Sequence, residues 1–173
     1  MTYVFLFICL VCLAVGFVLL WRARQLRART GLPPGAVVYV DTTQWKACQR
    51  PLFSEHYRLV GRPDYVVHQQ NRVIPVEVKS STGPGRPYDS HILQLMAYCL
   101  LIEETERRAP PFGLLHYPDV DFRIEYTAHA RKELITTLAQ LRSDLAAADV
   151  SRSHNNPGKC RSCGYRHACT QSL

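Results

Sequence analysis

The alternation of apolar and polar positions is clearest in the middle of the chain. Two runs rich in β-branched residues, 57–67 and 72–79, flank the polar stretch 68–71. Such runs on either side of a short polar segment predict a β-hairpin. A two-residue turn at Gln70 and Asn71 would connect the two strands.

Two helices and two further strands are predicted after this hairpin. A Gly/Pro-rich loop at residues 81–87 follows it, and Asp89 or Ser90 can cap the next helix. The later elements are, in chain order, a helix over 91–107, strands over 113–117 and 122–127, and a helix over 128–148. This order predicts an α/β domain with a mixed central sheet flanked by helices.

The chain begins with a long apolar run. Residues 2–21 contain no charged side chain, and a helix of about 20 residues spans a hydrocarbon core of about 30 Å. The run therefore predicts an N-terminal transmembrane helix. A cleaved signal peptide is the alternative, but nothing basic precedes the run and no small-x-small cleavage site follows it before Trp21.

Basic residues follow the apolar run at once and set its expected orientation. They are Arg22, Arg24, Arg27 and Arg29. The positive-inside tendency then predicts a single-pass protein of the cell membrane with its C-terminal domain in the cytoplasm. Residues 1–29 would form the anchor with its basic juxtamembrane segment, and a linker over residues 30–35 would lead into a domain spanning residues 30–173.

Charge contributes little to the functional interpretation. The chain has 21 basic and 14 acidic residues, a formal net charge of +7. Without the four arginines beside the apolar run, 17 basic residues face 14 acidic ones. This balance permits a polyanionic partner without requiring one.

Acidic residues meet in the predicted hairpin. If Gln69 pairs with Arg72, counting outward brings Asp64 opposite Glu77. Directly opposed residues have Cβ atoms roughly 5 Å apart, and like charges there are destabilising without a compensating group. Lys79 shares the face of Glu77, provided that no bulge shifts the register. A divalent cation between the two carboxylates would supply the compensation.

The cysteines fall into groups with different expected roles. Cys99 is expected in the core, and Cys9 and Cys12 are expected to be apolar residues of the first helix with no ligand role. The four with ligand spacing are Cys48, Cys160, Cys163 and Cys169. Thiolates suit structural zinc and a 4Fe-4S cluster equally, and His167 could replace one cysteine in a zinc site.

The motifs together resemble a known family. GRPD at residues 61–64, VEVK at 76–79 and QLMAY at 94–98 resemble the motifs of the PD-(D/E)xK nuclease superfamily, RecB-like branch. With Cys48 and CRSCGYRHAC, the chain is most similar to the CRISPR-associated Cas-four type iron–sulfur exonucleases. The resemblance covers residues 48–169 and favours a 4Fe-4S cluster over zinc.

This resemblance implies a role for each motif residue. Asp64, Glu77 and the Val78 carbonyl would bind Mg²⁺ or Mn²⁺, which take oxygen ligands. Lys79 would orient the attacking water or neutralise developing charge. The remaining motif residues, Gln94 and Tyr98, would steer the DNA strand from one face of a helix, although ordinary packing would also explain them.

The related families also place a metal-binding histidine upstream of the aspartate, on a helix. His56, eight positions before Asp64, is the nearest candidate in this chain. A position so close to the first strand is equally compatible with a solvent-exposed histidine.

The expected function is that of a membrane-tethered, metal-dependent DNA nuclease with an iron–sulfur cluster, acting as an exonuclease on single-stranded or frayed ends. A CRISPR integrase partner is implied by the resemblance alone. Two alternatives remain open at this point: a non-catalytic nucleic-acid-binding module and a zinc-binding, membrane-attached interaction scaffold.

Overall fold

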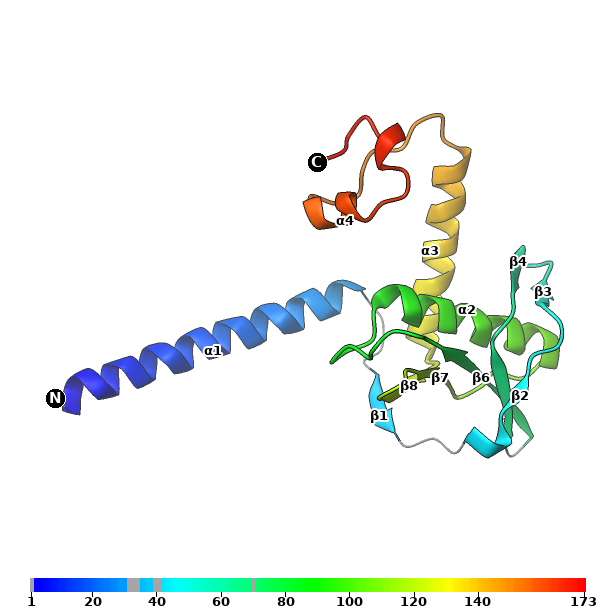
Figure 1. The fold of residues 1–173 in the computed structure, drawn as a ribbon, viewed down its shortest axis with the longest axis horizontal. Coiled ribbons are helices and arrows are strands. Elements are labelled where there is room, and N and C mark those ends of the chain that lie inside the picture. The colour runs from blue at the N-terminus through cyan, green and yellow to red at the C-terminus, as the bar shows by residue number, and fades with distance from the viewer. Residues whose placement is uncertain (1, 31–34, 39–41, 70) are drawn as a thin grey trace. The chain divides into compact units, whose positions relative to one another are not determined.

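The computed structural model describes residues 2–30, 35–38, 42–69 and 71–173 (Figure 1). The chain divides into two compact units, Met1–Ile135 and Thr136–Leu173. Residues 31–34 of the predicted linker and Gln70 of the predicted turn lie outside the described residues.

A six-stranded sheet forms the centre of the first unit. Its strand order is β1-β8-β7-β6-β5-β2. The bounds are β1 (Ala36–Val38), β2 (Lys46–Ala47), β5 (Tyr65–Gln69), β6 (Arg72–Val78), β7 (Phe112–His116) and β8 (Asp121–Glu125). Strands β6 and β7 run parallel, whereas the other paired neighbours are antiparallel. The predicted mixed sheet is confirmed.

The β5–β6 hairpin has the predicted register. Gln69 pairs with Arg72, and the ladder continues to Tyr65 opposite Val76. Asn71 has a positive φ of 62°, a conformation that asparagine tolerates better than most residues. The alternation of side chains along these strands therefore follows the sequence pattern.

The prediction of one continuous strand over residues 57–67 is wrong, because this range holds two separate strands. Pro63 interrupts it, because proline has no N–H to donate to a strand ladder. The earlier part pairs elsewhere: β4 (Leu59–Gly61) joins β3 (Leu52–Ser54) in a separate two-stranded sheet. The later part becomes β5, and a short 3₁₀ helix, η1 (Thr42–Gln44), precedes β2.

Helix α2 (Asp89–Glu106) connects β6 to its parallel neighbour β7 and contacts both strands, as well as β3 and β4 (Figure 1). Its buried residues are Ile92, Leu95, Met96, Tyr98, Cys99, Leu100, Leu101 and Ile102. Cys99 is fully buried, as predicted, and burial raises the pKa of its thiol well above the ordinary value. The N-cap is Tyr88 instead of Asp89 or Ser90, and Asp89 lies in the first turn, where its charge suits the helix dipole.

Helix α3 (Ala128–Ala146) begins after Thr127, whose side-chain oxygen accepts the Ala130 N–H at 3.1 Å. Arg131 of this helix pairs with Glu103 of α2 at 3.0 Å. The second unit further contains α4 (Pro157–Arg161) and η2 (Arg166–Ala168).

The predicted membrane span over residues 2–21 and the cell-membrane localisation are wrong. In the part of the chain that the structure describes, no helix has the length and apolar character needed to cross a membrane. The apolar run is not a helix by itself: α1 (Thr2–Thr30) continues beyond Trp21 and includes the four arginines that follow it.

Close packing between β7 and α2 gives the first prediction. A Cβ added to Gly113 would lie 2.6 Å from Leu95 Cγ, so Gly113→Ala should destabilise the protein by about 1–3 kcal/mol through overpacking. Urea unfolding measures this effect. Gly85→Ala is the matched control, because a Cβ there meets no atom within 4 Å. Equal unfolding free energies for the two variants would contradict the packing argument.

Candidate active site

Polar side chains from β6 and α2 converge beside the end of β6. Lys79 Nζ donates to Glu77 Oε1 at 2.9 Å and to Gln94 Oε1 at 2.7 Å. Gln94 Nε2 donates in turn to Glu77 Oε1 at 2.7 Å and to Tyr98 OH at 2.9 Å. The structure therefore brings four of the predicted site residues into one hydrogen-bonded network.

Asp64 lies just before β5, beside the same end of β6. Its Oδ2 accepts the Val78 N–H at 2.8 Å, and its backbone carbonyl accepts the Cys48 N–H at 3.2 Å. Both the side chain and the main chain of Asp64 are therefore held by neighbouring strand ends. Asp64 is exposed, so solvent can reach it.

Glu77 is the buried acid of the pair. It is only 6% exposed, and its Oε2 is buried without a hydrogen-bond partner among the described residues. Burial raises the pKa of Glu77, and the charge of Asp64 raises it further, whereas Lys79 opposes the shift. A buried carboxylate oxygen without a donor suits a cation ligand, so the donor set fits a hard divalent ion.

Tyr98 is buried against Gly61 of β4, and its hydroxyl is hydrogen-bonded to Gln94. It is 8% exposed, and a Cβ at Gly61 would lie 2.9 Å from its Cε1. Burial raises the pKa of Tyr98, so its hydroxyl stays protonated and retains a proton to donate. Packing and polar contact therefore both explain this residue.

The structure does not bring His56 to the two acids. His56 lies in the turn after β3, with its ring edge-on to Tyr57 at 4.5 Å between centroids. Throughout the described residues, no three His, Cys, Asp or Glu side chains are grouped so that they could hold a metal ion.

The cysteines of the predicted cluster are likewise not grouped around a common point among the described residues. In the second unit Cys160 belongs to α4 and is buried, whereas Cys163 and Cys169 are exposed. Cys48 belongs to the first unit, and its Sγ donates to the Arg50 carbonyl at 3.3 Å. The four-cysteine cluster stays a prediction.

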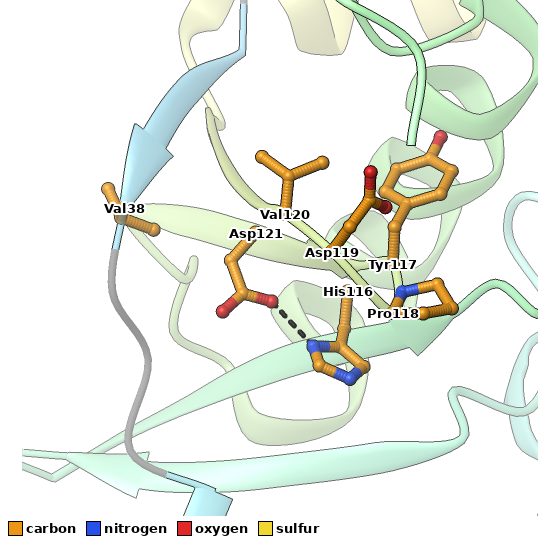
Figure 2. A pocket seen from close by; sticks show the side chains of 7 residues that line it. All are labelled: Val38, His116, Tyr117, Pro118, Asp119, Val120 and Asp121. Atoms are coloured by element: carbon orange, nitrogen blue, oxygen red, sulfur yellow. Dashed lines mark hydrogen bonds and ion pairs between the residues drawn. The ribbon is translucent and has the colours of Figure 1, made fainter. Parts of the chain in front are cut away.

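One residue that supports the Lys79 backbone was not predicted from the sequence. His116 on β7 pairs with Val78, and its carbonyl accepts the Lys79 N–H at 2.8 Å, which fixes the backbone of the lysine. Its side chain lines a hollow of about 440 Å³ by the β7–β8 turn, with its Nδ1 2.5 Å from Asp121 Oδ1 (Figure 2). Only the parallel pairing of β6 with β7 reveals this neighbour, and that pairing is not encoded in a local motif.

The mixed sheet and the polar network at the end of β6 agree with the nuclease class that the motifs predicted. The family comparison agrees, because the model of the PD-(D/E)XK nuclease superfamily matches residues 15–170. The chain belongs to this superfamily, as its motifs predicted.

Two curated relatives match about two thirds of the chain. Both are named CRISPR-associated exonuclease Cas4. The protein from Francisella tularensis subsp. novicida is 28% identical over 116 residues, which is 67% of this chain and 58% of the relative. The protein from Thermoproteus tenax is 26% identical over 114 residues, 65% of this chain and 60% of the relative. The chain thus spans less than two thirds of the length of these relatives.

Gln94 connects three polar groups, and its removal tests the network. Gln94→Met deprives Lys79, Glu77 and Tyr98 of a partner each, so we expect a loss of about 1–3 kcal/mol in the free energy of unfolding. Urea unfolding of parent and variant gives the difference. Gln140→Met is the matched control, since Gln140 is an exposed helical glutamine whose amide donates only to Asp144 among the bonds described. A loss no larger than in the control would contradict the network.

Proposed function

We propose that the chain is a divalent-metal-dependent deoxyribonuclease that acts as an exonuclease on single-stranded or frayed DNA ends. The observation that carries the proposal is the buried Oε2 of Glu77 beside Asp64, which has no hydrogen-bond partner in the described part of the chain, while Lys79 and Gln94 fix the other oxygen. The word exonuclease in the names of the two relatives supports the preference for ends.

The side chains have distinct tasks in this proposal. Asp64 and Glu77 supply carboxylate oxygens, and a bound Mg²⁺ or Mn²⁺ would activate water and neutralise charge on the scissile phosphate. Lys79 places an ammonium group beside the acids, where it can neutralise developing negative charge. Gln94 holds Glu77 and Lys79 at a fixed separation through its two amide ends.

A non-catalytic nucleic-acid-binding module is the second candidate. One observation favours it: within the described residues, no third carboxylate, histidine or cysteine joins Asp64 and Glu77. A metal held by two protein ligands would keep more water ligands, which Mg²⁺ tolerates well. Cleavage therefore has to be measured to separate the two candidates.

The decisive measurement is cleavage of end-labelled single-stranded DNA with Mn²⁺. We expect the parent to cut and Glu77→Gln to lose at least about 10²-fold in rate, the scale for removing one group that stabilises the transition state. Glu106→Gln is the control, because Glu106 is an exposed glutamate at the end of α2. DNA binding without cleavage by the parent would favour the binding module instead.

Metal binding can be measured without any reaction. At a Mn²⁺ concentration 100 times its Kd, the parent should gain about 2.7 kcal/mol of stability, and Glu77→Gln should gain much less. Equal melting shifts for the two proteins would exclude Glu77 as a ligand.

The cysteine motif is proposed to bind a 4Fe-4S cluster, supported by its spacing and by the resemblance of the motif to iron–sulfur exonucleases. Iron and sulfide analysis of anaerobically purified protein should find both elements, and Cys163→Ser should lose them. Cys12→Ser is the control, since Cys12 is an exposed cysteine outside the motif. Zinc in place of iron would contradict the cluster.

A further inference from the structure

Positive charge is concentrated in one short segment of the domain. Between residues 46 and 62 four basic side chains face a single acidic one, Glu55. The rest of the chain from residue 30 onward has 13 basic and 13 acidic residues. The segment therefore carries the whole net charge of this part of the chain. Its basic residues are Lys46, Arg50, Arg58 and Arg62.

The same segment exposes an apolar pair. Phe53 on β3 is directly opposite Val60 on β4, so their side chains share one face of the two-stranded sheet. They are 60% and 63% exposed, whereas the neighbouring Ser54 is 3% exposed. Because β3 and β4 contact α2, one face of the sheet is packed and the other presents a phenyl ring to solvent.

The turn of the β3–β4 hairpin is firmly structured. Arg58 N–H donates to the Glu55 carbonyl at 3.0 Å, and Tyr57 N–H donates to Ser54 Oγ at 3.1 Å. Arg58 has a positive φ of 41°, which is costly for a side chain of this size. The hairpin therefore presents its exposed groups from a defined backbone.

The hairpin leads directly into the candidate active site. Leu52 pairs with Gly61, so Arg50 and Arg62 lie at the same end of the hairpin. Gly61 packs against the Tyr98 ring, and Asp64 follows three residues later. Four residues of extended chain cover at most about 14 Å, so Val60 lies within that distance of Asp64.

We propose that the outward face of the β3–β4 hairpin binds the single-stranded part of the substrate next to the active site. Phe53 would stack on a base, and Arg50, Arg58 and Arg62 would contact phosphates. This inference rests on the proposed function. An aromatic platform among basic residues is how proteins hold single strands without reading their sequence, and the charge of the hairpin complements a polyanion.

Binding is tested in the full chain carrying Glu77→Gln, so that the DNA is not cut. Anisotropy of a labelled single-stranded oligonucleotide should show that Phe53→Thr weakens binding roughly 5- to 150-fold, the range for losing one stacked base. Phe53→Tyr should retain binding, because the ring remains. Leu145→Ala, which truncates an apolar side chain that is 78% exposed, should have no effect.

The salt dependence of binding tests the arginines separately. Each of Arg50→Asn, Arg58→Asn and Arg62→Asn should reduce the slope of log K against log salt by about 0.7, the value for one phosphate contact on a single strand. Asn at position 58 suits the positive φ, so that variant removes the charge and preserves the turn.

The outcomes separate the two proposals. If the parent cleaves DNA but the Phe53 and arginine variants bind with unchanged affinity and salt slope, the hairpin inference is overturned and the nuclease stands. If the Glu77→Gln protein binds no oligonucleotide, the hairpin inference fails whatever the parent does. Loss of cleavage in Glu77→Gln with weakened binding in Phe53→Thr supports both.

Discussion

The hydrogen bonds that hold the buried Glu77 carboxylate are the constraint around which the rest of the site is arranged. Removing a charged carboxylate from water costs several kcal/mol unless donors replace the lost water. Lys79 and Gln94 both donate to one oxygen of Glu77, and the other oxygen has no partner among the residues that the structure describes. The donors are a lysine two residues after Glu77, just past the end of β6, and a glutamine on α2, so strand and helix must keep a fixed separation.

The buried Glu77 network stabilises the protein less than apolar side chains of similar volume would. A buried carboxylate with a raised pKa opposes folding at neutral pH, because the unfolded chain ionises the group more easily. The apolar residues of α2 and the parallel pairing of β6 with β7 offset this cost around the site. If this position served stability alone, an apolar side chain would be more favourable there than a carboxylate. A residue that lowers stability in this way is typical of a functional position.

Local patterns were sufficient to predict the centre of the site. The register of β5 and β6 follows from period-two alternation, and Gln94 and Tyr98 share a helix face because they are four residues apart. Local patterns were not sufficient where pairing is non-local. The predicted first strand of the hairpin joined β4 to β5 across Pro63, and β1, β2 and β3 were not predicted, because short strands with distant partners carry little local signal. The predicted membrane span failed separately, since no helix in the described part of the chain has the length and apolar character to cross a membrane.

The site residues lie close together in the sequence, which determines when they are synthesised relative to the rest of the sheet. Asp64, Glu77, Lys79, Gln94 and Tyr98 all fall between residues 64 and 98, on a hairpin and the helix that follows it. Contacts of such short separation form quickly, whereas β7 must close a longer loop before it pairs with β6. During synthesis the segment that carries both acids therefore leaves the ribosome before β7, the strand whose His116 carbonyl accepts the Lys79 N–H.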